Sequence, residues 1–300
     1  MLSQSEIRAG ITNKLIEVLK SGKHIPWRKP WRGIDGPRLP TNFVTGRPYS
    51  GWNVMALWLA AQERGYSLDW WASYQQWRSK GANVKRGEKA TQIIFWRPVS
   101  KLVKGKDGDE TEKTFPILRT WSIFNIAQVE GKIVEQLQQE PALLKFDQSD
   151  RGELDRAIAA TGADIRLGSK AVYYRPPQDY VEMPEEGRFL SFPGYAETLL
   201  HEVGGHWTES RLGWLGSYAE GELRAEIASC FLTAALGIPD SCELTNHASY
   251  LASWLEALEN DHRFIFRASS AASKAAEFFL SFSRPQTEAE NNIGAEAVAD

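Results

Sequence analysis

Three residues in one short segment could hold and use a metal ion. The segment TLLHEVGGHWTES contains His201 and His206, and Glu202 directly follows the first histidine. In the H-E-x-x-H motif, two histidines one helical turn apart bind a metal, and the glutamate accepts a proton from metal-activated water. The pattern predicts hydrolytic chemistry, with Glu202 as the catalytic base and zinc, or another divalent transition metal such as Mn²⁺, as the cofactor.

The spacing departs from that motif by one residue. Val203, Gly204 and Gly205 separate Glu202 from His206. At about 100° per residue, an i,i+4 pair diverges by about 40° around a helix axis, whereas an i,i+5 pair diverges by about 140°. A shared metal therefore requires a π-bulge or a break at the two glycines. The alternative is that the histidines are hydrogen-bonded residues of an ordinary core.

A third protein ligand is expected from the next helical segment, YAEGELRAEIASCFLTAALGI. Its apolar face includes Leu223 and Ile227, and Glu226 projects at the edge of that face. Because an unpaired carboxylate is costly to bury, coordination would explain Glu226, giving two histidines and a glutamate with an open position for water. Glu222, one turn earlier, is the competing candidate, or it orients an imidazole from outside the ligand set. Alternatively, Glu226 is salt-bridged at a solvated helix edge.

Cations and aromatic residues alternate in the N-terminal half. They occur in a Pro- and Gly-rich stretch from Pro26 to Tyr49 and again between residues 85 and 97. Because cations follow phosphates and aromatic rings stack on unpaired bases, this composition predicts binding of single-stranded nucleic acid. The alternative is a plain solvated face. The candidate contact residues are Trp27, Arg28, Lys29, Trp31, Arg32, Arg38, Arg47, Tyr49, Lys85, Arg86 and Lys89.

The charge is divided between two halves of the chain. Residues 1–140 hold 22 Lys and Arg against 13 Asp and Glu, whereas residues 141–300 hold 13 against 25. Nine of the 12 tryptophans fall within the first 121 residues, so two properties mark one division. Two cysteines are too few for a disulfide framework, and no apolar run approaches the roughly 18 residues of a membrane span. The sequence predicts a cytoplasmic protein with two domains and no membrane partner.

The elements expected around these residues give an α+β fold class. The first half should be α+β, with helices at 5–20, 51–64 and 70–80 and a hairpin formed by TQIIFWRPV and FPILRTWSIFNIAQV. The second half should be mostly helical with a small edge sheet. Its expected elements are a helix at RGELDRAIAAT, a hairpin at AVYYRPPQDYVEMP, and helices near 194–210, 218–236, 246–259 and 268–283. The predicted boundaries are a basic nucleic-acid-binding domain at 1–135, a linker at 136–152, a metal-binding domain at 153–285 and a flexible tail at 286–300.

The motifs resemble, in order, those of the ArdC-type antirestriction proteins carried by conjugative plasmids. The matching segments are TGRPYSGWNVMALWLA, VKRGEKATQIIFW, WSIFNIAQVEG, LLHEVGGHWTES, YAEGELRAEIASCFLTAALGI and HASYLASWLEALENDHRFIFRAS. The resemblance implies an N-terminal domain that binds single-stranded DNA and a C-terminal zincin-like metallopeptidase domain, which protect incoming plasmid DNA from host restriction. It places the family's metal motif on His201, Glu202 and His206 and its second-helix glutamate on Glu226. Relatives usually have two residues, not three, between the glutamate and the second histidine.

Two functions remain open from the sequence, and a third, an accessory domain of plasmid primase machinery, is weaker because the sequence shows no acidic metal-binding triad of a polymerase. In the first, a DNA-bound metallopeptidase cleaves an unidentified host protein near transferred single strands. In the second, a non-catalytic protein shields single-stranded DNA and its metal domain is degenerate. The additional glycine favours the second function, whereas the retained Glu202 beside two candidate ligands favours the first.

Overall fold

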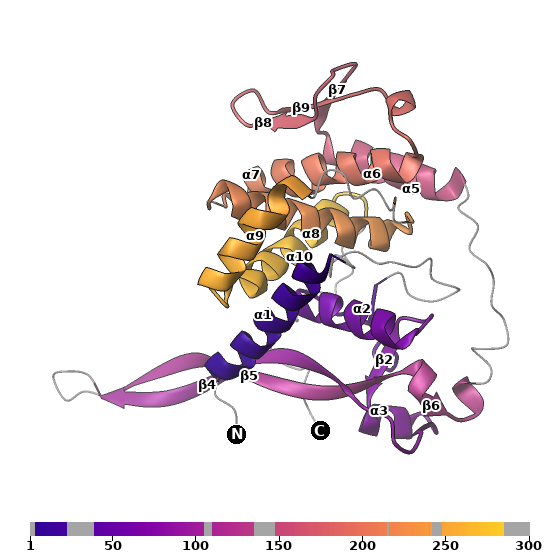
Figure 1. Cartoon of the computed structure of the whole chain (residues 1–300), viewed down its shortest axis with the longest axis vertical. Coiled ribbons are helices and arrows are strands. Elements are labelled where there is room, and N and C mark those ends of the chain that lie inside the picture. Colours follow the sequence, from indigo (N-terminus) through magenta and orange to yellow (C-terminus); the bar gives the residue numbers. More distant parts are fainter. Residues whose placement is uncertain are drawn as a thin grey trace.

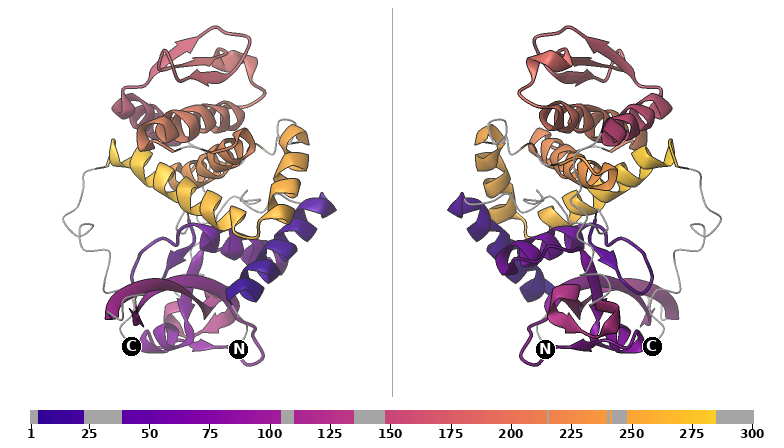
Figure 2. Two further views of the ribbon diagram at one scale, coloured as in Figure 1. Left: turned by 90° about the vertical axis from the view of Figure 1, so that its left-hand side faces the viewer. Right: turned by 90° about the vertical axis from the view of Figure 1, so that its right-hand side faces the viewer.

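The fold is mixed α+β with a mostly helical C-terminal half, which confirms the predicted class (Figure 1). The long β4–β5 hairpin lies at one end, the helices are stacked in the middle, and a small sheet lies at the opposite end (Figure 2). The computed structural model describes residues 4–22, 39–104, 110–134, 148–214, 216–239, 241 and 248–284. The predicted tail at 286–300 and most of the predicted linker at 136–152 lie outside these ranges.

The N-terminal half is built on a sheet with the strand order β1-β2-β5-β4. Its strands are β1 (Thr41–Asn42), β2 (Trp70–Ser73), β4 (Thr91–Lys104) and β5 (Glu110–Asn125). Its helices are α1 (Gln4–Ser21), α2 (Trp52–Arg64) and α3 (Tyr74–Ser79), and β3 (Asn83–Val84) pairs with β6 (Val129–Glu130). The predicted hairpin and the helices at 5–20 and 51–64 are confirmed.

The helix predicted at 70–80 is wrong in its first four residues, which form β2 beside β5. The physical reason is local. The Ser73 hydroxyl accepts a hydrogen bond from the Gln76 amide, and the Gln76 side chain accepts one from the Ser73 amide. This reciprocal cap starts α3 after Ser73, while the buried Trp71 remains available to the sheet.

The C-terminal half contains six α-helices and one π-helix among the described residues. They are α5 (Gln148–Thr161), α6 (Phe192–Leu200), the π-helix η3 (His201–Trp207), α7 (Thr208–Leu212), α8 (Tyr218–Leu236), α9 (Ala248–Asn260) and α10 (Phe264–Ser281). The predicted hairpin is present as β8 (Tyr173–Arg175) and β9 (Tyr180–Met183), and β7 (Asp164–Leu167), which was not predicted, lies parallel to β9. Within the described ranges, no helix has the length and apolar character needed to cross a membrane.

The two halves share one hydrophobic core. Trp58 of α2 contacts Phe231 of α8 with ring centroids 5.9 Å apart, and Trp52 contacts Phe266 of α10 at 5.8 Å. Helix α1 packs against α9, and these apolar residues belong to a single buried cluster (Figure 2). The division into domains at the boundaries given by the sequence stays a prediction. The shared core indicates that the two halves support one another.

We expect the substitution Thr12→Val to lower the free energy of unfolding of the whole chain. The buried Thr12 hydroxyl on α1 donates to the carbonyl oxygen of His262 at 3.0 Å, and losing such a bond costs about 1–2 kcal/mol. Urea unfolding followed by circular dichroism and by tryptophan fluorescence should give coincident, equally shifted transitions. Thr120→Val, at an exposed strand position, is the matched control and should change stability by less than about 0.5 kcal/mol. A shift seen by one probe alone would contradict a shared core.

Candidate metal centre

A π-helical turn accommodates the additional residue of the histidine segment. Helix α6 continues without interruption through η3 into α7. The Thr208 amide lies within hydrogen-bonding range of the Val203 carbonyl, five residues earlier, and the Thr208 hydroxyl donates to the same carbonyl at 3.0 Å. Because a π turn holds more residues than an α turn, it brings the i,i+5 pair His201 and His206 back to one face. Of the two conformations that the sequence allowed, the structure adopts the π-bulge.

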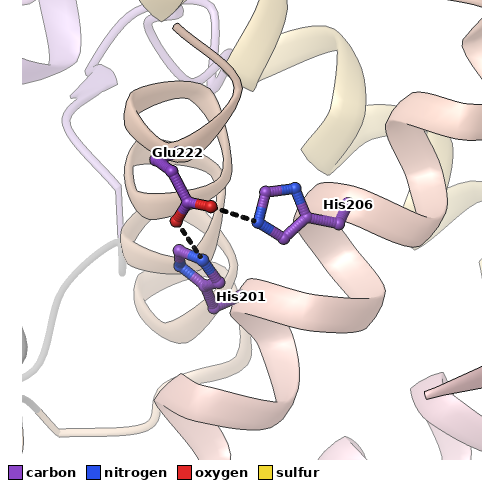
Figure 3. Close-up of side chains that lie close together, drawn as sticks. All are labelled: His201, His206 and Glu222. Carbon is purple, nitrogen blue, oxygen red and sulfur yellow. Dashed lines mark ion pairs between the residues drawn. The ribbon is translucent and has the colours of Figure 1, made fainter. Parts of the chain in front are cut away.

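Both imidazoles face one carboxylate of α8 (Figure 3). His201 Nε2 lies 3.4 Å from Glu222 Oε2, and His206 Nε2 lies 3.5 Å from Glu222 Oε1. One potential ligand atom from each of these three residues lies within 4.8 Å of the other two. His201, His206 and Glu222 are therefore placed to share one ion.

Glu226, the third ligand that the sequence favoured, has a different position. Its Oε2 lies 3.7 Å from His201 Nδ1, whereas Glu222 faces the other ring nitrogen, Nε2. Glu222 thus lies near both histidines, whereas Glu226 lies near His201 alone; which of the two is the third ligand stays a prediction. Helical periodicity placed both glutamates on the face of α8 that meets η3, but it could not give the point along α8 where η3 crosses.

The two glycines of η3 set that crossing point. A Cβ atom at Gly205 would lie 2.6 Å from the Ala225 Cα atom, and a Cβ atom at Gly204 would lie 2.2 Å from Leu232 Cδ1. A residue with a side chain at either position would overlap its neighbour unless that neighbour moved. The glycines therefore let α8 lie directly against η3, which brings Glu222 within reach of both histidines.

The charges at this site are strongly coupled. Burial acts against a charged His201, but hydrogen bonds with Glu222 and Glu226 outweigh it and raise the pKa of His201 to about 10. Burial also acts against a charged Glu222, but its hydrogen bonds with His201 and His206 outweigh it and lower the pKa of Glu222 far below its usual range. The carboxylates thus favour a positive charge between them, which a divalent cation also supplies.

Glu202, the predicted catalytic base, lies in the same pocket as the two histidines. Its Oε2 is buried and has no hydrogen-bond partner among the described residues, an arrangement that is costly without a ligand or water. Glu202 lines a pocket of about 880 Å³ together with His201, His206 and Glu222. Two imidazoles and a carboxylate suit Zn²⁺ or Mn²⁺, so the donor set and the unpartnered oxygen both fit a hydrolytic metal site.

Metal binding is expected to release a proton. The raised pKa keeps His201 protonated at neutral pH, whereas a metal binds neutral imidazole. The affinity for Zn²⁺ or Mn²⁺ should therefore fall roughly tenfold for each pH unit between about pH 8 and 6, the slope of a one-proton exchange. Calorimetry in buffers of different ionisation enthalpy counts the proton. The Glu226→Gln variant lacks one cause of the raised pKa of His201, so it should release a smaller fraction of a proton when it binds metal. A metal affinity that is independent of pH would contradict the coupling between metal binding and the protonation of His201.

The structure describes five of the eleven predicted nucleic-acid contacts. Arg47, Lys85, Arg86 and Lys89 are exposed, as contact with a phosphate backbone requires. Tyr49 is half-buried against the core, burial raises its pKa to about 12, and its contact with nucleic acid stays a prediction. The remaining six, Trp27, Arg28, Lys29, Trp31, Arg32 and Arg38, lie outside the described residues.

Sequence reasoning missed an exposed aromatic face on the hairpin. Phe115 and Trp121 of β5 are 43% and 41% exposed, and Arg119 between them is also exposed. These positions differ by even numbers, so they lie on one side of the strand. The available signal was the spacing of Phe115, Arg119 and Trp121, which places two aromatic residues and a cation on one side of the strand. The segment was interpreted only as an element of the sheet.

Comparison with known proteins identifies the family. Residues 5–124 match the N-terminal domain of anti-restriction factor ArdC, and residues 152–271 match a zincin-like metallopeptidase family. The metal-free crystal structure of the antirestriction ArdC protein from the R388 plasmid matches with a TM-score of 0.75 and 36% identity, over 93% of this chain and 98% of that one. This chain belongs to the ArdC family of antirestriction proteins. The Mn(II)-bound crystal structure of the same plasmid's ArdC protein matches with a TM-score of 0.72 and 34% identity, over 93% of this chain and 99% of that one.

Two further proteins share the ArdC-like sequence. The chain is 34% identical to protein y4eC of Sinorhizobium fredii, over 91% of each. It is 37% identical to a DNA primase TraC of Escherichia coli, over 92% of this chain but 27% of TraC. The ArdC-family unit therefore corresponds to about a quarter of that longer protein.

Proposed function

We propose that this ArdC-family chain binds single-stranded DNA in the cytoplasm and hydrolyses a peptide bond in a host protein, and thereby protects incoming conjugative DNA from restriction. One observation carries the proposal: two imidazoles and the Glu222 carboxylate converge within 4.8 Å, in a pocket that is also lined by Glu202, whose buried Oε2 has no partner among the described residues. A buried carboxylate oxygen without a partner at a pocket wall supports a site that takes a ligand or water.

The residues divide the chemistry among them. His201, His206 and Glu222 would hold a divalent ion such as Zn²⁺ or Mn²⁺, and Glu226 would orient His201. When bound, the ion would supply Lewis acidity, which lowers the pKa of water and polarises a carbonyl group. Glu202 accepts the water proton as the oxygen adds to the carbonyl carbon, and returns it to the leaving nitrogen as the C–N bond breaks.

The exposed cations and aromatic rings of the N-terminal half support binding of single strands. Affinity should fall with rising salt, because each phosphate contact displaces counterions. Charge reversal at Arg28, Lys29 and Arg32, or at Lys85, Arg86 and Lys89, should weaken binding of a labelled oligonucleotide in an anisotropy titration. Binding that is independent of salt would overturn this part of the proposal.

The substitution Glu202→Gln separates catalysis from DNA binding. It keeps the shape of the side chain but removes the base, so metal content and single-strand affinity should be unchanged while cleavage of a peptide library falls by about 100-fold or more. Plasmid transfer into a restricting host then tests the biological role. Equal protection by wild type and Glu202→Gln would favour the non-catalytic, DNA-shielding alternative.

A further inference from the structure

A second pocket, of about 760 Å³, lies where the two halves of the chain meet. Arg8 comes from α1 and Trp96 from β4, both in the N-terminal half. Trp214 follows α7, and Arg263, Arg267 and Lys274 lie at the start of α10 or within it. We call this site the seam pocket. Its volume is in the range that holds a small ligand or one unit of a polymer, about 300–1,000 Å³.

The seam pocket carries an excess of positive charge. Arg224 pairs with Glu209 at 2.6 Å, and Arg267 pairs with Asp261 at 2.6 Å, while Glu220 lies 3.5 Å from Arg224 and 3.9 Å from Arg267. Arg8, Arg263 and Lys274 have no carboxylate within ion-pair distance in the described part of the chain. Five cations thus face three carboxylates, which leaves two positive charges for a ligand.

Arg8 and Arg263 lie near enough for their like charges to act on each other, and the carboxylate that acts on Arg263, Asp261, already pairs with Arg267. Arg8 Nε is buried and has no hydrogen-bond partner among the described residues, although another nitrogen of the guanidinium donates to Gln4 Oε1 at 3.1 Å. Burial and the like charge of Arg263 lower the pKa of Arg8. A desolvated donor next to a second cation is an arrangement that an anion stabilises.

Two tryptophans provide apolar walls beside these cations. Trp96 is 47% exposed although it lines a pocket, and the Arg8 guanidinium carbon lies 5.2 Å from its ring centroid. Trp214 is half-buried and lines the same pocket. Cations beside partly open indole rings match a phosphate joined to an aromatic base.

We propose that the seam pocket binds one nucleotide unit, with its phosphate at Arg8, Arg263 and Lys274 and its base against Trp96 or Trp214. The unit belongs to a bound single strand or to a free nucleotide. For the strand, the inference rests on the proposed single-strand binding. The proposal extends the DNA path onto α10, which belongs to the half of the chain with a negative net charge. It also brings the DNA path beside the candidate metal centre, because Trp214 and Arg224 line both pockets.

Neutralising the two unpaired cations of α10 tests this assignment. In an anisotropy titration with labelled oligo-dT, Arg263→Gln combined with Lys274→Gln should reduce the slope of log affinity against log salt by about 1.4, or about 0.7 per lost contact. Affinity in 0.1 M salt should fall by about 20-fold.

The control variant combines Arg156→Gln with Lys170→Gln. Both residues are exposed and have no ion pairs among the described residues, so the variant removes the same charge elsewhere and should change neither the slope nor the affinity. Equal slopes in the two double variants would overturn the seam pocket while leaving single-strand binding intact; a wild type that binds no single strand would overturn the proposed function itself.

Photocrosslinking locates the base and identifies its source. An oligonucleotide that carries 5-iodouracil should crosslink to Trp96 or Trp214, and crosslinks found only at other residues would overturn the proposal. Free 5-iodouridine monophosphate that crosslinks at the same residues would assign the pocket to free nucleotides as well, whereas crosslinking by the oligonucleotide alone would assign it to the strand. Poly-glutamate that displaces the probe as well as unlabelled oligo-dT does would overturn the assignment to nucleic acid.

Discussion

Glu222→Gln is expected to lower the affinity for Zn²⁺ or Mn²⁺ by more than about 100-fold, and Glu226→Gln by about tenfold. Loss of an outer partner that orients a ligand typically costs about 10–100-fold, so loss of a ligand should exceed that range. Glu222 has one oxygen near each histidine, whereas Glu226 approaches His201 from its other side. The two substitutions are chemically identical and lie one turn apart on α8, so each is the matched control of the other.

Metal content after dialysis, measured by mass spectrometry, and competition with a chromogenic chelator give the two affinities. His206→Ala provides the reference for a lost ligand. If Glu226→Gln loses as much metal as His206→Ala while Glu222→Gln retains it, then Glu226 is the third ligand and the helices cross differently in the metal-bound protein. Retention of one equivalent by all three variants would place the metal elsewhere.

Gly205→Ala should destabilise the protein and lower its metal affinity together. The added methyl carbon would lie 2.5 Å from the Ala225 Cβ atom and 2.6 Å from its Cα atom, so the backbone of α8 must move. Overpacking of this kind costs about 1–3 kcal/mol, and movement of α8 withdraws Glu222 from the histidines. Gly204→Ala should have a smaller effect, because its nearest neighbour is the end of the Leu232 side chain, which can change rotamer.

Gly10→Ala is the matched control for these substitutions. Gly10 lies within α1, is exposed, and an added Cβ atom would meet nothing within 4 Å. Alanine there should stabilise the helix by about 0.5–1 kcal/mol, the usual gain over glycine. Denaturant unfolding beside metal titration distinguishes the effects, and a Gly205→Ala protein with wild-type stability and metal affinity would contradict the close approach of η3 to α8.

Local signals were sufficient for much of the architecture. The apolar spacing of residues 5–20 predicted α1, and the alternation on either side of a charged turn predicted the β4–β5 hairpin. The pair Gly204 and Gly205 also indicated that the histidine helix could not be regular. These features depend on neighbours close in sequence, which the sequence displays directly.

Features that depend on contacts between distant segments were not predictable in the same way. That Glu222, and not Glu226, lies near both histidines depends on the position at which η3 meets Ala225, which is a matter of packing. The seam pocket joins Arg8 to Lys274 across most of the chain, and no local pattern links them. The division of charge between the two halves of the chain indicated that nucleic acid would not bind at α10, which lies in the negative half. Net charge is a sum over the whole half and does not show a local group of cations.

The π turn of η3 also bears on how such sites change length during evolution. One residue added to a regular α-helix rotates everything beyond it by about 100°, which would turn α7 away from its neighbours. A π turn confines the added residue to a single turn, so α7 still packs against α10. Search patterns that require two residues between the glutamate and the second histidine would pass over this chain, although its two histidines still face one carboxylate. The number of intervening residues is thus a weaker guide to a metal centre than the face to which the helix returns them.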